Sequence, residues 1–349
     1  MPTELLVLTL DEFRRLAEQE GEPSFRGNQL YRAIYAEGCW EFSRMTNLSR
    51  ALQERLERQT CLTLPQIEKR YPAADGTIRY VLRFSDGKAI ETVWMPEAGR
   101  QTLCLSTQAG CAVDCHFCAT AQLGLLRNLT AGEIVGQIMI VLADHRSVRQ
   151  PRTNIVLMGQ GEPLLNYEAT LRAVRLMADT AGMNILLRRI TLSTSGIVPG
   201  IRRLAQEALR PKLAVSLNAS TDEQRSALMP INRKYPLGEL LDACRDYPLR
   251  PWERLSFEYV LLGECNDSPA DAHRLIALTR GLRCKINLIS WNAVPGLSYR
   301  APAAGAVEAF QQILRDAGLL AFIRRPRGQD VFAACGQLAL LETPAPAQP

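Results

Sequence analysis

The chain has 349 residues, of which 47% are hydrophobic, and it carries a formal net charge of +5 at pH 7. This composition is typical of a protein with a full hydrophobic core, and the length fits one large domain with an appendage, or two domains. No apolar run is long enough to span a membrane and no signal peptide opens the sequence, so we expect a cytoplasmic protein that does not bind membranes.

Residues 1–62 predict a small helical domain. Polar capping residues precede three segments with apolar residues at helical spacing, and the helices should end near residues 17, 35 and 58. We expect the first to be capped by Thr9 or Asp11. The third should begin at Leu48 after a cap at Thr46 or Asn47. Basic residues on the other faces leave two interpretations open, a packing domain or an RNA-contacting module.

Residues 63–100 predict a β-hairpin extension. Residues 78–84 and 89–95 have the alternation of β-strands, and the sequence Ser-Asp-Gly-Lys between them contains Asp-Gly, a strong hairpin signal. Glu91 lies on the second of these strands. Its position in the pattern alone predicts an ordinary surface carboxylate.

Residues 101–340 alternate between strand and helix patterns. Strands are expected at 102–106, 154–158, 189–193, 212–217, 255–262 and 285–289, and a last one at 320–324. Helices are expected at 131–142, 168–178, 200–208, 237–247, 270–279 and 304–316. Such alternation predicts a parallel sheet, and six units are too few to close an eight-stranded barrel. We therefore expect an α/β fold with an open partial (β/α)6 TIM-like barrel, followed by a disordered tail at 341–349.

Three of the ten cysteines, Cys111, Cys115 and Cys118, form a C-x3-C-x2-C motif. Three thiolates do not complete a tetrahedral structural zinc site, but they can hold three irons of a cubane cluster and leave the fourth iron open. The alternative is three structural cysteines, or a disulfide with one spare thiol. Cys104 and Cys335 lie outside the motif, and their spacing alone favours two buried thiols.

Polar residues follow four of the expected strands, at the edge of the sheet where α/β barrels carry their active sites. Residues 159–163 contain two glycines, which let backbone approach a ligand, and Glu162, which can accept hydrogen bonds from an ammonium group. The later clusters are residues 193–196, 216–218 and 291–292. Each is a weak signal alone. Together they predict a site for a polar small molecule.

The cysteine motif, with Phe117 before Cys118, resembles the signature of the radical S-adenosylmethionine (SAM) superfamily, in which the open iron chelates SAM. Over nearly the whole chain the sequence resembles the RlmN/Cfr family of RNA methyltransferases. The matching stretches are residues 45–48, 102–104, 110–118, 127–130, 159–163, 193–196, 229–232, 285–289 and 333–338. The Cfr branch methylates carbon 8 of adenosine and usually has other residues at 161–163 and 193–196. The resemblance is therefore stronger to the RlmN branch, which methylates carbon 2.

The resemblance implies a radical SAM barrel that carries one 4Fe–4S cluster on the three motif cysteines and consumes two SAM molecules per methylation. The SAM-binding residues that it implies are Gly161, Glu162, Ser193, Ser216, Leu217, Asn218 and Asn292. Asn218 stands where many family members have His, so a hydrogen-bonding role is kept and a titrating role is lost.

The resemblance also implies the order of chemical steps. One SAM methylates Cys335, and a radical from the second SAM takes a hydrogen from that methyl group. The resulting carbon radical adds to carbon 2 of adenosine and forms an RNA–protein thioether. Cys104 then attacks the sulfur of Cys335 and releases the product, and Glu91 accepts the proton of carbon 2.

The implied substrates are 23S rRNA and tRNA, and the implied partner is a flavodoxin-like electron donor for a monomeric enzyme. The target base has to leave its stack to reach the site. Two other hypotheses stay open at this stage. One is a Cfr-type carbon 8 methyltransferase. The other is a non-catalytic RNA-binding protein stabilised by a metal, which predicts bound zinc and no cleavage of SAM.

Overall fold

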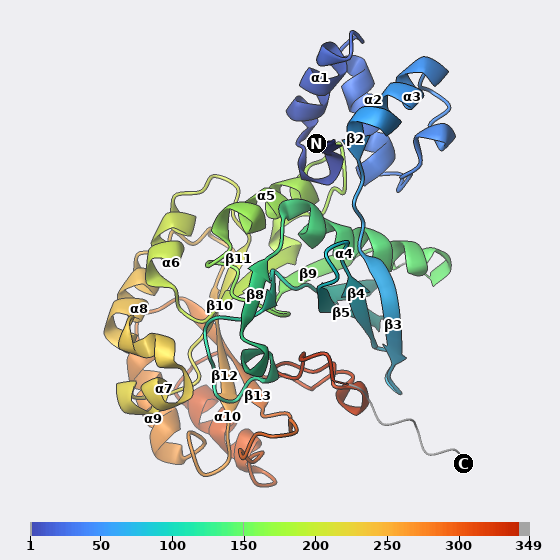
Figure 1. The fold of residues 1–349 in the computed structure, drawn as a ribbon. Coiled ribbons are helices and arrows are strands. Elements are labelled where there is room, and N and C mark those ends of the chain that lie inside the picture. The colour runs from blue at the N-terminus through green and yellow to red at the C-terminus, as the bar shows by residue number, and fades with distance from the viewer. Residues whose placement is uncertain (1, 149, 342–349) are drawn as a thin grey trace, which may run out of the picture.

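A ten-stranded sheet forms the centre of the protein, which a computed structural model describes for residues 2–148 and 150–341 (Figure 1). Its strand order is β14-β13-β12-β11-β10-β9-β6-β5-β4-β3, so β14 and β3 lie at the two edges and the sheet is open. The strands from β14 to β6 run parallel to their neighbours. They are β6 (Arg100–Cys104), β9 (Thr153–Leu157), β10 (Ile190–Thr194), β11 (Lys212–Ser216), β12 (Leu255–Leu261), β13 (Cys284–Ser290) and β14 (Ala321–Ile323).

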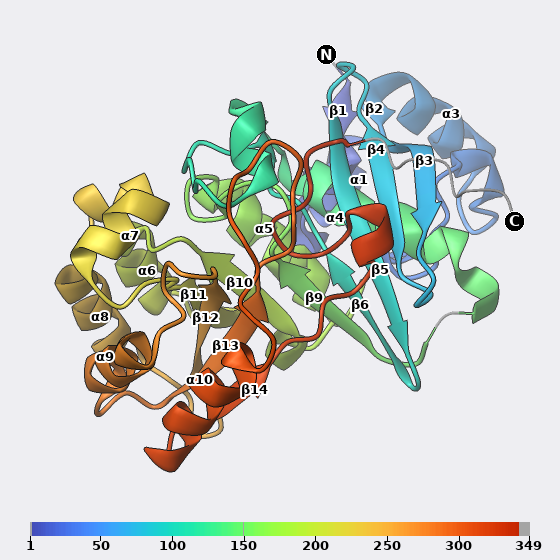
Figure 2. The ribbon, with the colours of Figure 1, turned by 90° about the horizontal axis from the view of Figure 1, so that it is seen from below.

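Helices connect the parallel strands and cover the outer side of the sheet, as Figures 1 and 2 show. They are α4 (Ala131–Asp144), α5 (Tyr167–Ala178), α6 (Val198–Ala205), α8 (Leu237–Arg245), α9 (Pro269–Thr279) and α10 (Ala306–Asp316). Parallel strands joined through helices are buried on both faces, and accordingly Leu213, Ala214 and Val215 of β11 are fully buried. The predicted open partial barrel is confirmed. One further helix, α7 (Asp222–Leu228), was not predicted.

The predicted hairpin continues the barrel sheet. Strands β4 (Ile78–Arg83) and β5 (Ala89–Glu97) agree with the sequence pattern, and β5 pairs with β6 in antiparallel fashion, with Val93 opposite Cys104. A third strand, β3 (Gln66–Pro72), pairs with β4 at the sheet edge. It was missed because most of its residues are polar and exposed, which hides the alternation of a half-buried strand.

The N-terminal helices α1 (Leu10–Gln19), α2 (Phe25–Tyr35) and α3 (Arg50–Gln59) form a separate lobe beside α4 and α5 (Figure 1). Thr9 caps α1, as predicted, in a capping box with Glu12. The expected start of the third helix was wrong. Ser49 adopts the extended conformation of a cap and its hydroxyl accepts a hydrogen bond from the Leu52 amide, so α3 begins at Arg50.

The lobe is fastened to the barrel by polar and apolar contacts. The guanidinium of Arg172 on α5 donates to the Val7 carbonyl and pairs with Glu12 of α1. One continuous hydrophobic core includes side chains of the lobe and of the barrel. None of the helices within residues 2–148 and 150–341 combines the length and apolarity that a membrane span requires.

After β14 the chain turns back across the strand ends toward β5, as the red segment in Figure 2 shows. This C-terminal segment, residues 324–341, carries Cys335 and packs beside β5 and β6. The predicted disordered tail lies outside the described residues, apart from Leu341. The segment therefore covers one half of the sheet edge at which the parallel strands end.

Candidate active site

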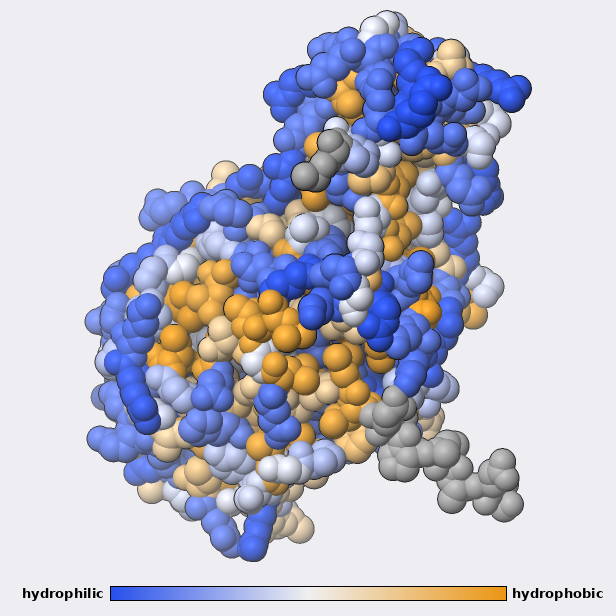
Figure 3. Space-filling view, viewed as in Figure 1, coloured by the Kyte–Doolittle hydropathy of each residue, from blue (hydrophilic) through white to orange (hydrophobic). Residues whose placement is uncertain are grey.

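The candidate residues gather at the carboxyl ends of the parallel strands. Figure 3 shows apolar side chains in the middle of this face of the barrel domain, with hydrophilic residues around them. Leu125 and Leu126 of β8 (Leu125–Asn128) are about half exposed there, at 44% and 53%. A large base can lie against such a surface, since exposed apolar patches commonly mark binding sites.

The three-cysteine loop begins after β7 (Gln108–Gly110), which pairs with β8. Gly110 has a positive φ of 76°, and a Cβ there would overlap the carbonyl oxygen of Gly124. The same carbonyl accepts a hydrogen bond from the Cys111 amide at 2.9 Å. The Cys118 amide donates to the Cys115 carbonyl at 3.0 Å, which closes the loop. All three cysteines are half-buried.

The three thiols are close enough to influence one another. Burial raises the pKa of Cys115, and the neighbouring Cys118 and Cys111 raise it further. Among residues 2–148 and 150–341, however, no three His, Cys, Asp or Glu side chains converge closely enough to hold a single metal ion. A cubane cluster spaces its cysteine sulfurs more widely, because each sulfur binds a different iron. By number and kind, the three cysteines suit a cubane cluster with one open iron, and they are one ligand short of a structural zinc site.

Glu162 lies beside this loop and is almost fully buried, at 3% exposure. One carboxylate oxygen accepts from the Ser195 amide at 2.7 Å and the other from the Leu164 amide at 3.0 Å. Burial raises the pKa of Glu162, and these two amides oppose the rise. Gly161, with φ of 97°, leaves no room for a side chain because a Cβ would overlap Gln108.

Several polar atoms in the site have no partner. Within the described residues, the hydroxyls of Thr107 and Ser195 and the Gln160 side-chain oxygen are buried without a hydrogen bond. Buried polar groups are nearly always satisfied, so these atoms are available to hydrogen-bond a ligand that enters the site. Two predicted residues are half-buried at the same strand ends, Ser193 of β10 and Ser216 of β11.

Leu217 and Asn218 follow β11, but their polar atoms are largely engaged by the protein. The Leu217 amide donates to the Glu258 carbonyl. The Asn218 side chain accepts from the Val260 amide at 2.9 Å and donates to the Met229 sulfur at 3.3 Å. Asn218 has a positive φ of 57°, a conformation that Asn adopts more readily than most residues. Its amide group therefore fastens the loop after β11 to β12.

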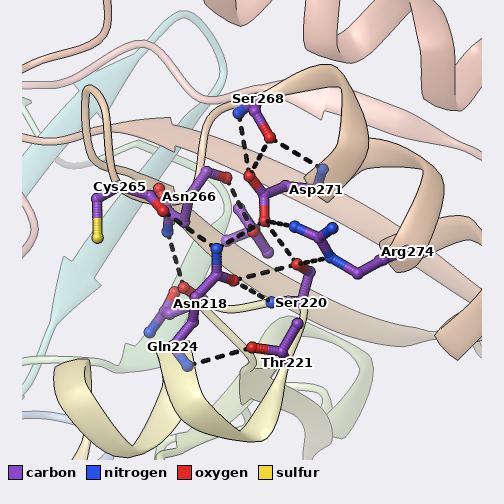
Figure 4. A network of polar contacts seen from close by, with 10 residues as sticks. Asn218, Ser220, Thr221, Gln224, Cys265, Asn266, Ser268, Asp271 and Arg274 are labelled. Carbon is purple, nitrogen blue, oxygen red and sulfur yellow. Dashed lines mark hydrogen bonds and ion pairs between the residues drawn. The ribbon is translucent and has the colours of Figure 1, made fainter.

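Asn218 borders a polar network centred on Asp271, which Figure 4 shows between the loops after β11 and β12. The Asn266 side chain donates to the Asn218 carbonyl, and Ser220 and Gln224 donate to the Asp271 carboxylate. Burial acts to raise the pKa of Asp271, but the hydrogen bonds outweigh it and lower the pKa to about 2. The network holds the two loops in a fixed relation.

Cys104 and Cys335 are brought together although 230 residues separate them. Cys104, at the end of β6, belongs to the same apolar cluster as Val331, Ala333 and Leu338 of the C-terminal segment. Burial raises the pKa of the Cys104 thiol and the nearby Cys335 raises it further. Cys335 itself is exposed as a residue, and desolvation of its sulfur raises its pKa. Both thiols are free.

Asn292, predicted to bind SAM, lies after β13 and positions the Cys335 loop. Its side-chain nitrogen donates to the Cys335 carbonyl at 3.0 Å, and its oxygen accepts from the Gln329 side chain at 2.8 Å. The adjacent Trp291 donates from its indole nitrogen to the Phe117 carbonyl in the three-cysteine loop, at 3.0 Å. These two neighbours link the cysteine motif to the segment that carries Cys335.

Glu91 is fully buried, which corrects the expectation from its strand pattern that it is a surface carboxylate. It forms an ion pair with Arg79 of β4, which is also fully buried. Its other oxygen accepts from the Leu340 amide at 2.9 Å and from Gln160 at 3.3 Å. Burial raises the pKa of Glu91, whereas Arg79 and the Leu340 amide oppose the rise. The partners come from three separate segments, so the sequence pattern could not place this carboxylate inside.

Sequence reasoning also missed two arginines of the site. Arg79 appeared only as one polar residue of an alternating strand, and Arg225 lies on the unpredicted helix α7. A helix signal was present, because Thr221 caps α7 through the Gln224 amide. No local pattern marks either arginine as buried.

Two family models match the chain. The Radical SAM superfamily matches residues 105–276, and the Ribosomal RNA large subunit methyltransferase N-terminal domain matches residues 3–62. A probable dual-specificity RNA methyltransferase RlmN of Koribacter versatilis is 50% identical over 93% of this chain and 98% of its own length. The dual-specificity RNA methyltransferase RlmN of Anaeromyxobacter dehalogenans is 50% identical over 91% of this chain and 87% of its own.

A solved structure agrees with these sequence matches. The crystal structure of a radical SAM methyltransferase from Sphaerobacter thermophilus superimposes with a TM-score of 0.92 and 46% identity. The match covers 97% of this chain and 99% of that chain. The similarity thus extends over the lobe, the hairpin and the barrel.

Proposed function

The chain belongs to the RlmN family of radical SAM RNA methyltransferases, and from this premise we propose that it methylates carbon 2 of an adenosine in 23S rRNA and in tRNA. The observation that supports this proposal most strongly is that Cys104 packs against the C-terminal segment that carries Cys335. This contact lies at the strand ends, and the three-cysteine loop is bonded to the same edge through Trp291. A methyl group carried on Cys335 would there lie next to a second thiol able to release it.

Cys111, Cys115 and Cys118 would hold a 4Fe–4S cluster, and the Glu162 carboxylate would receive the SAM amino group. When bound, the cluster supplies the electron that cleaves SAM to a radical. Ser193, Ser216 and the unpartnered Ser195 hydroxyl would bind other polar groups of SAM. Leu217, Asn218 and Asn292 shape the same edge, the last through its bond to the Cys335 carbonyl.

Cys335 would take a methyl group from one SAM by displacement, which requires its thiolate. Its raised pKa keeps the thiol protonated at neutral pH. A positively charged sulfonium beside the sulfur favours the thiolate and so promotes the reaction only when SAM is bound. After hydrogen removal and addition to the base, the radical adduct would have to lose one electron, which a bound cluster could take back, and the carbon 2 proton. Cys104 would then attack the Cys335 sulfur, the carbon–sulfur bond would break as the methyl carbon takes up a proton, and a disulfide would be left for reduction.

Glu91 would accept the proton lost from carbon 2. A buried carboxylate with a raised pKa is a stronger base than an exposed one, and its ion pair with Arg79 fixes where its oxygens point. Carbon 2 of adenine is electron-poor, which explains why radical addition is needed and polar methyl transfer fails.

The division into a lobe (1–62), a hairpin (63–100) and a barrel (101–340) gives each unit a role. We assign RNA binding to the lobe, whose family model is named for large-subunit ribosomal RNA methyltransferases. The hairpin supplies Glu91 and Arg79. The barrel supplies the cluster and SAM sites, with electrons from a flavodoxin-like donor and the enzyme acting as a monomer.

The test is anaerobic reconstitution with iron and sulfide, followed by turnover with SAM and RNA. We expect four irons per chain, reductive cleavage of SAM and 2-methyladenosine in the digested RNA by mass spectrometry. 8-Methyladenosine would instead identify a Cfr-type enzyme. Bound zinc without cleavage of SAM would identify a non-catalytic RNA-binding protein and would refute the proposal.

A further inference from the structure

Arg225 is one of the two largest fully buried side chains of the protein, at 0% exposure. It lies on α7, between the strand ends that carry the candidate SAM-binding residues. Leu228, three residues later on the same helix face, is also buried, so α7 turns this face inward.

The guanidinium joins the ends of two neighbouring strands. Its Nε donates to the Leu217 carbonyl at 3.1 Å, and one terminal nitrogen donates to the carbonyls of Ser195 at 2.6 Å and Ser216 at 3.1 Å. The other terminal nitrogen donates to the Asn232 side-chain oxygen at 3.1 Å. The planar fork of arginine can make several such bonds at once, which lysine cannot. Arg225 therefore fixes the loops that follow β10 and β11.

The charge of Arg225 is not neutralised by these contacts, because all four acceptors are uncharged. In the described part of the chain Arg225 forms no direct ion pair with a carboxylate; the Asp222 carboxylate is joined to it only through the Asn232 side chain, which accepts from Arg225 and donates to Asp222 at 2.9 Å. Burial lowers its pKa to about 10, so the group remains a cation at neutral pH. The helix that carries Arg225 contacts the cysteine motif directly, because the His116 amide donates to the Leu228 carbonyl at 3.0 Å and Cys115 packs against the cluster that contains Leu228.

An unpaired buried charge is costly, and an anion beside it removes the cost. A cubane cluster bound through three thiolates is negatively charged and gains another negative charge on reduction. The reduction potential of such clusters depends on net charge and on nearby hydrogen bonds. A buried cation near Cys115 stabilises the reduced, more negative state more than the oxidised state.

We propose that Arg225 is a positioning residue that compensates the charge of the cluster near Cys115 and aligns the carbonyl ends of β10 and β11 for SAM. The proposal rests on the proposed function, since it requires a cluster on the three motif cysteines. It assigns two separable tasks to one side chain. The positive charge of Arg225 raises the reduction potential of the cluster. The planar guanidinium holds the carbonyl groups after β10 and β11 in the positions that SAM binding requires.

The test compares Arg225→Gln, Arg225→Lys and the control Arg202→Gln in the reconstituted full-length protein. Arg202 of α6 is 56% exposed, so its substitution removes the same charge from the surface. The cluster midpoint potential is measured by a redox titration followed by electron paramagnetic resonance, without SAM or RNA. SAM affinity is measured separately by equilibrium binding.

For Arg225→Gln we expect the ratio of reduced to oxidised cluster at a fixed potential to fall at least tenfold. This corresponds to a midpoint ~59 mV more negative for a one-electron couple. Arg225→Lys should keep the potential of the unaltered protein and bind SAM about tenfold more weakly, since the charge stays and the fork is lost. Arg202→Gln should change neither quantity.

An unchanged potential in Arg225→Gln overturns the charge role, and unchanged SAM affinity in Arg225→Lys overturns the positioning role. If Arg225→Gln does not retain iron, the charge role is tested with Arg225→Lys instead. A midpoint potential of Arg225→Lys that differs by ~59 mV or more from that of the unaltered protein contradicts the charge role, because the positive charge is kept. Failure of the proposed function gives a different result. A non-catalytic metal-binding protein would assemble no redox-active cluster in the unaltered chain, and a Cfr-type enzyme would be recognised by 8-methyladenosine in the RNA whatever the Arg225 variants show.

Discussion

Arg79 and Arg225, the two fully buried arginines among residues 2–148 and 150–341, lie in different halves of the candidate site and have different partners. Arg79 pairs with the Glu91 carboxylate, and one of its terminal nitrogens donates to the Leu341 carbonyl at 2.8 Å. Arg225 meets only neutral oxygens. The charges in the half that would carry the methyl group are thus paired within the protein, whereas Arg225 in the half that would hold the cofactors has no carboxylate of the described residues bonded to it.

This difference distinguishes structural from ligand-binding polar groups. The two charges of a buried ion pair compensate each other without a ligand, so substitutions in the Arg79–Glu91 pair should affect folding and proton transfer directly. A buried charge without a counter-charge indicates a missing anion. The following predictions test this contrast, beginning with the largest expected effect.

Glu91→Gln should reduce RNA methylation by about 10²–10⁴-fold, because the amide cannot accept the carbon 2 proton. SAM cleavage and methylation of Cys335 should continue, and the RNA–protein thioether should accumulate. The rates are followed by mass spectrometry of RNA and protein. Glu97→Gln on the same strand, where the carboxylate is 38% exposed, is the control and should leave the rates unchanged. Near-normal methylation in Glu91→Gln would exclude Glu91 as the base.

Arg79→Met should lower the free energy of unfolding by about 3–5 kcal/mol, since it leaves a buried carboxylate without its counter-charge. The double variant Arg79→Met/Glu91→Gln should recover a large part of this loss. Urea unfolding of the apo-protein measures both. Arg83→Met on the same strand, with its side chain 44% exposed, should lower the free energy of unfolding far less, because exposed ion pairs contribute little. If Arg79→Met and Arg83→Met lowered the free energy of unfolding equally, the buried Glu91 carboxylate would not depend on Arg79 as its counter-charge.

Asp271→Asn should lower the free energy of unfolding by about 2 kcal/mol at pH 7. The folded-state pKa of Asp271 is about 2, below its ordinary value. Its contribution is therefore present above about pH 4 and is lost as the pH falls from about 4 to about 2. The difference between variant and unaltered protein should shrink over that window in urea titrations. A difference independent of pH would contradict the assigned ionisation.

Asn292→Ala should loosen the loop that carries Cys335, because it removes the hydrogen bonds to the Cys335 carbonyl and from the Gln329 side chain, which together should be worth at least about 1 kcal/mol. Amide hydrogen exchange of residues 329–337, measured without SAM, should become about fivefold faster. Amides of α10 serve as the internal reference and should exchange at the same rate in both proteins. Unchanged exchange in the loop would mean that other contacts, such as the Ala119 amide to the Gly336 carbonyl, suffice to hold it.

The sequence predicted the barrel and the cysteine loop because both depend on local spacing. Alternating strand and helix patterns require no knowledge of distant contacts, and three cysteines within eight residues are neighbours in any fold. Their roles and those of Cys104, Cys335 and Glu91 followed from family resemblance. The convergence of Cys104 with Cys335 is a long-range contact that spacing could not reveal.

The buried arginines show where sequence reasoning stopped. Arg79 alternates with apolar residues on β4 and therefore fits an ordinary exposed position, although its carboxylate partner lies on β5. Arg225 depends on carbonyl groups, and backbone acceptors leave no signature in the side-chain pattern. The family resemblance implies that Asn218 binds SAM, and it gave no sign that the side chain also bonds to Val260 and Met229. In each case the hydrogen-bond partners lie on other strands or loops, so the contacts of the residue could not be predicted from its neighbours in the sequence.

The most direct test of the central claim is the protein species formed by Cys104→Ala during turnover with SAM and RNA. The account predicts a covalent RNA–protein adduct, because the thioether can form on Cys335 but cannot be released. Mass spectrometry after nuclease and protease digestion should locate a methylene bridge between the Cys335 sulfur and carbon 2 of adenosine. Methylated RNA released at the normal rate, without an adduct, would contradict the two-thiol mechanism.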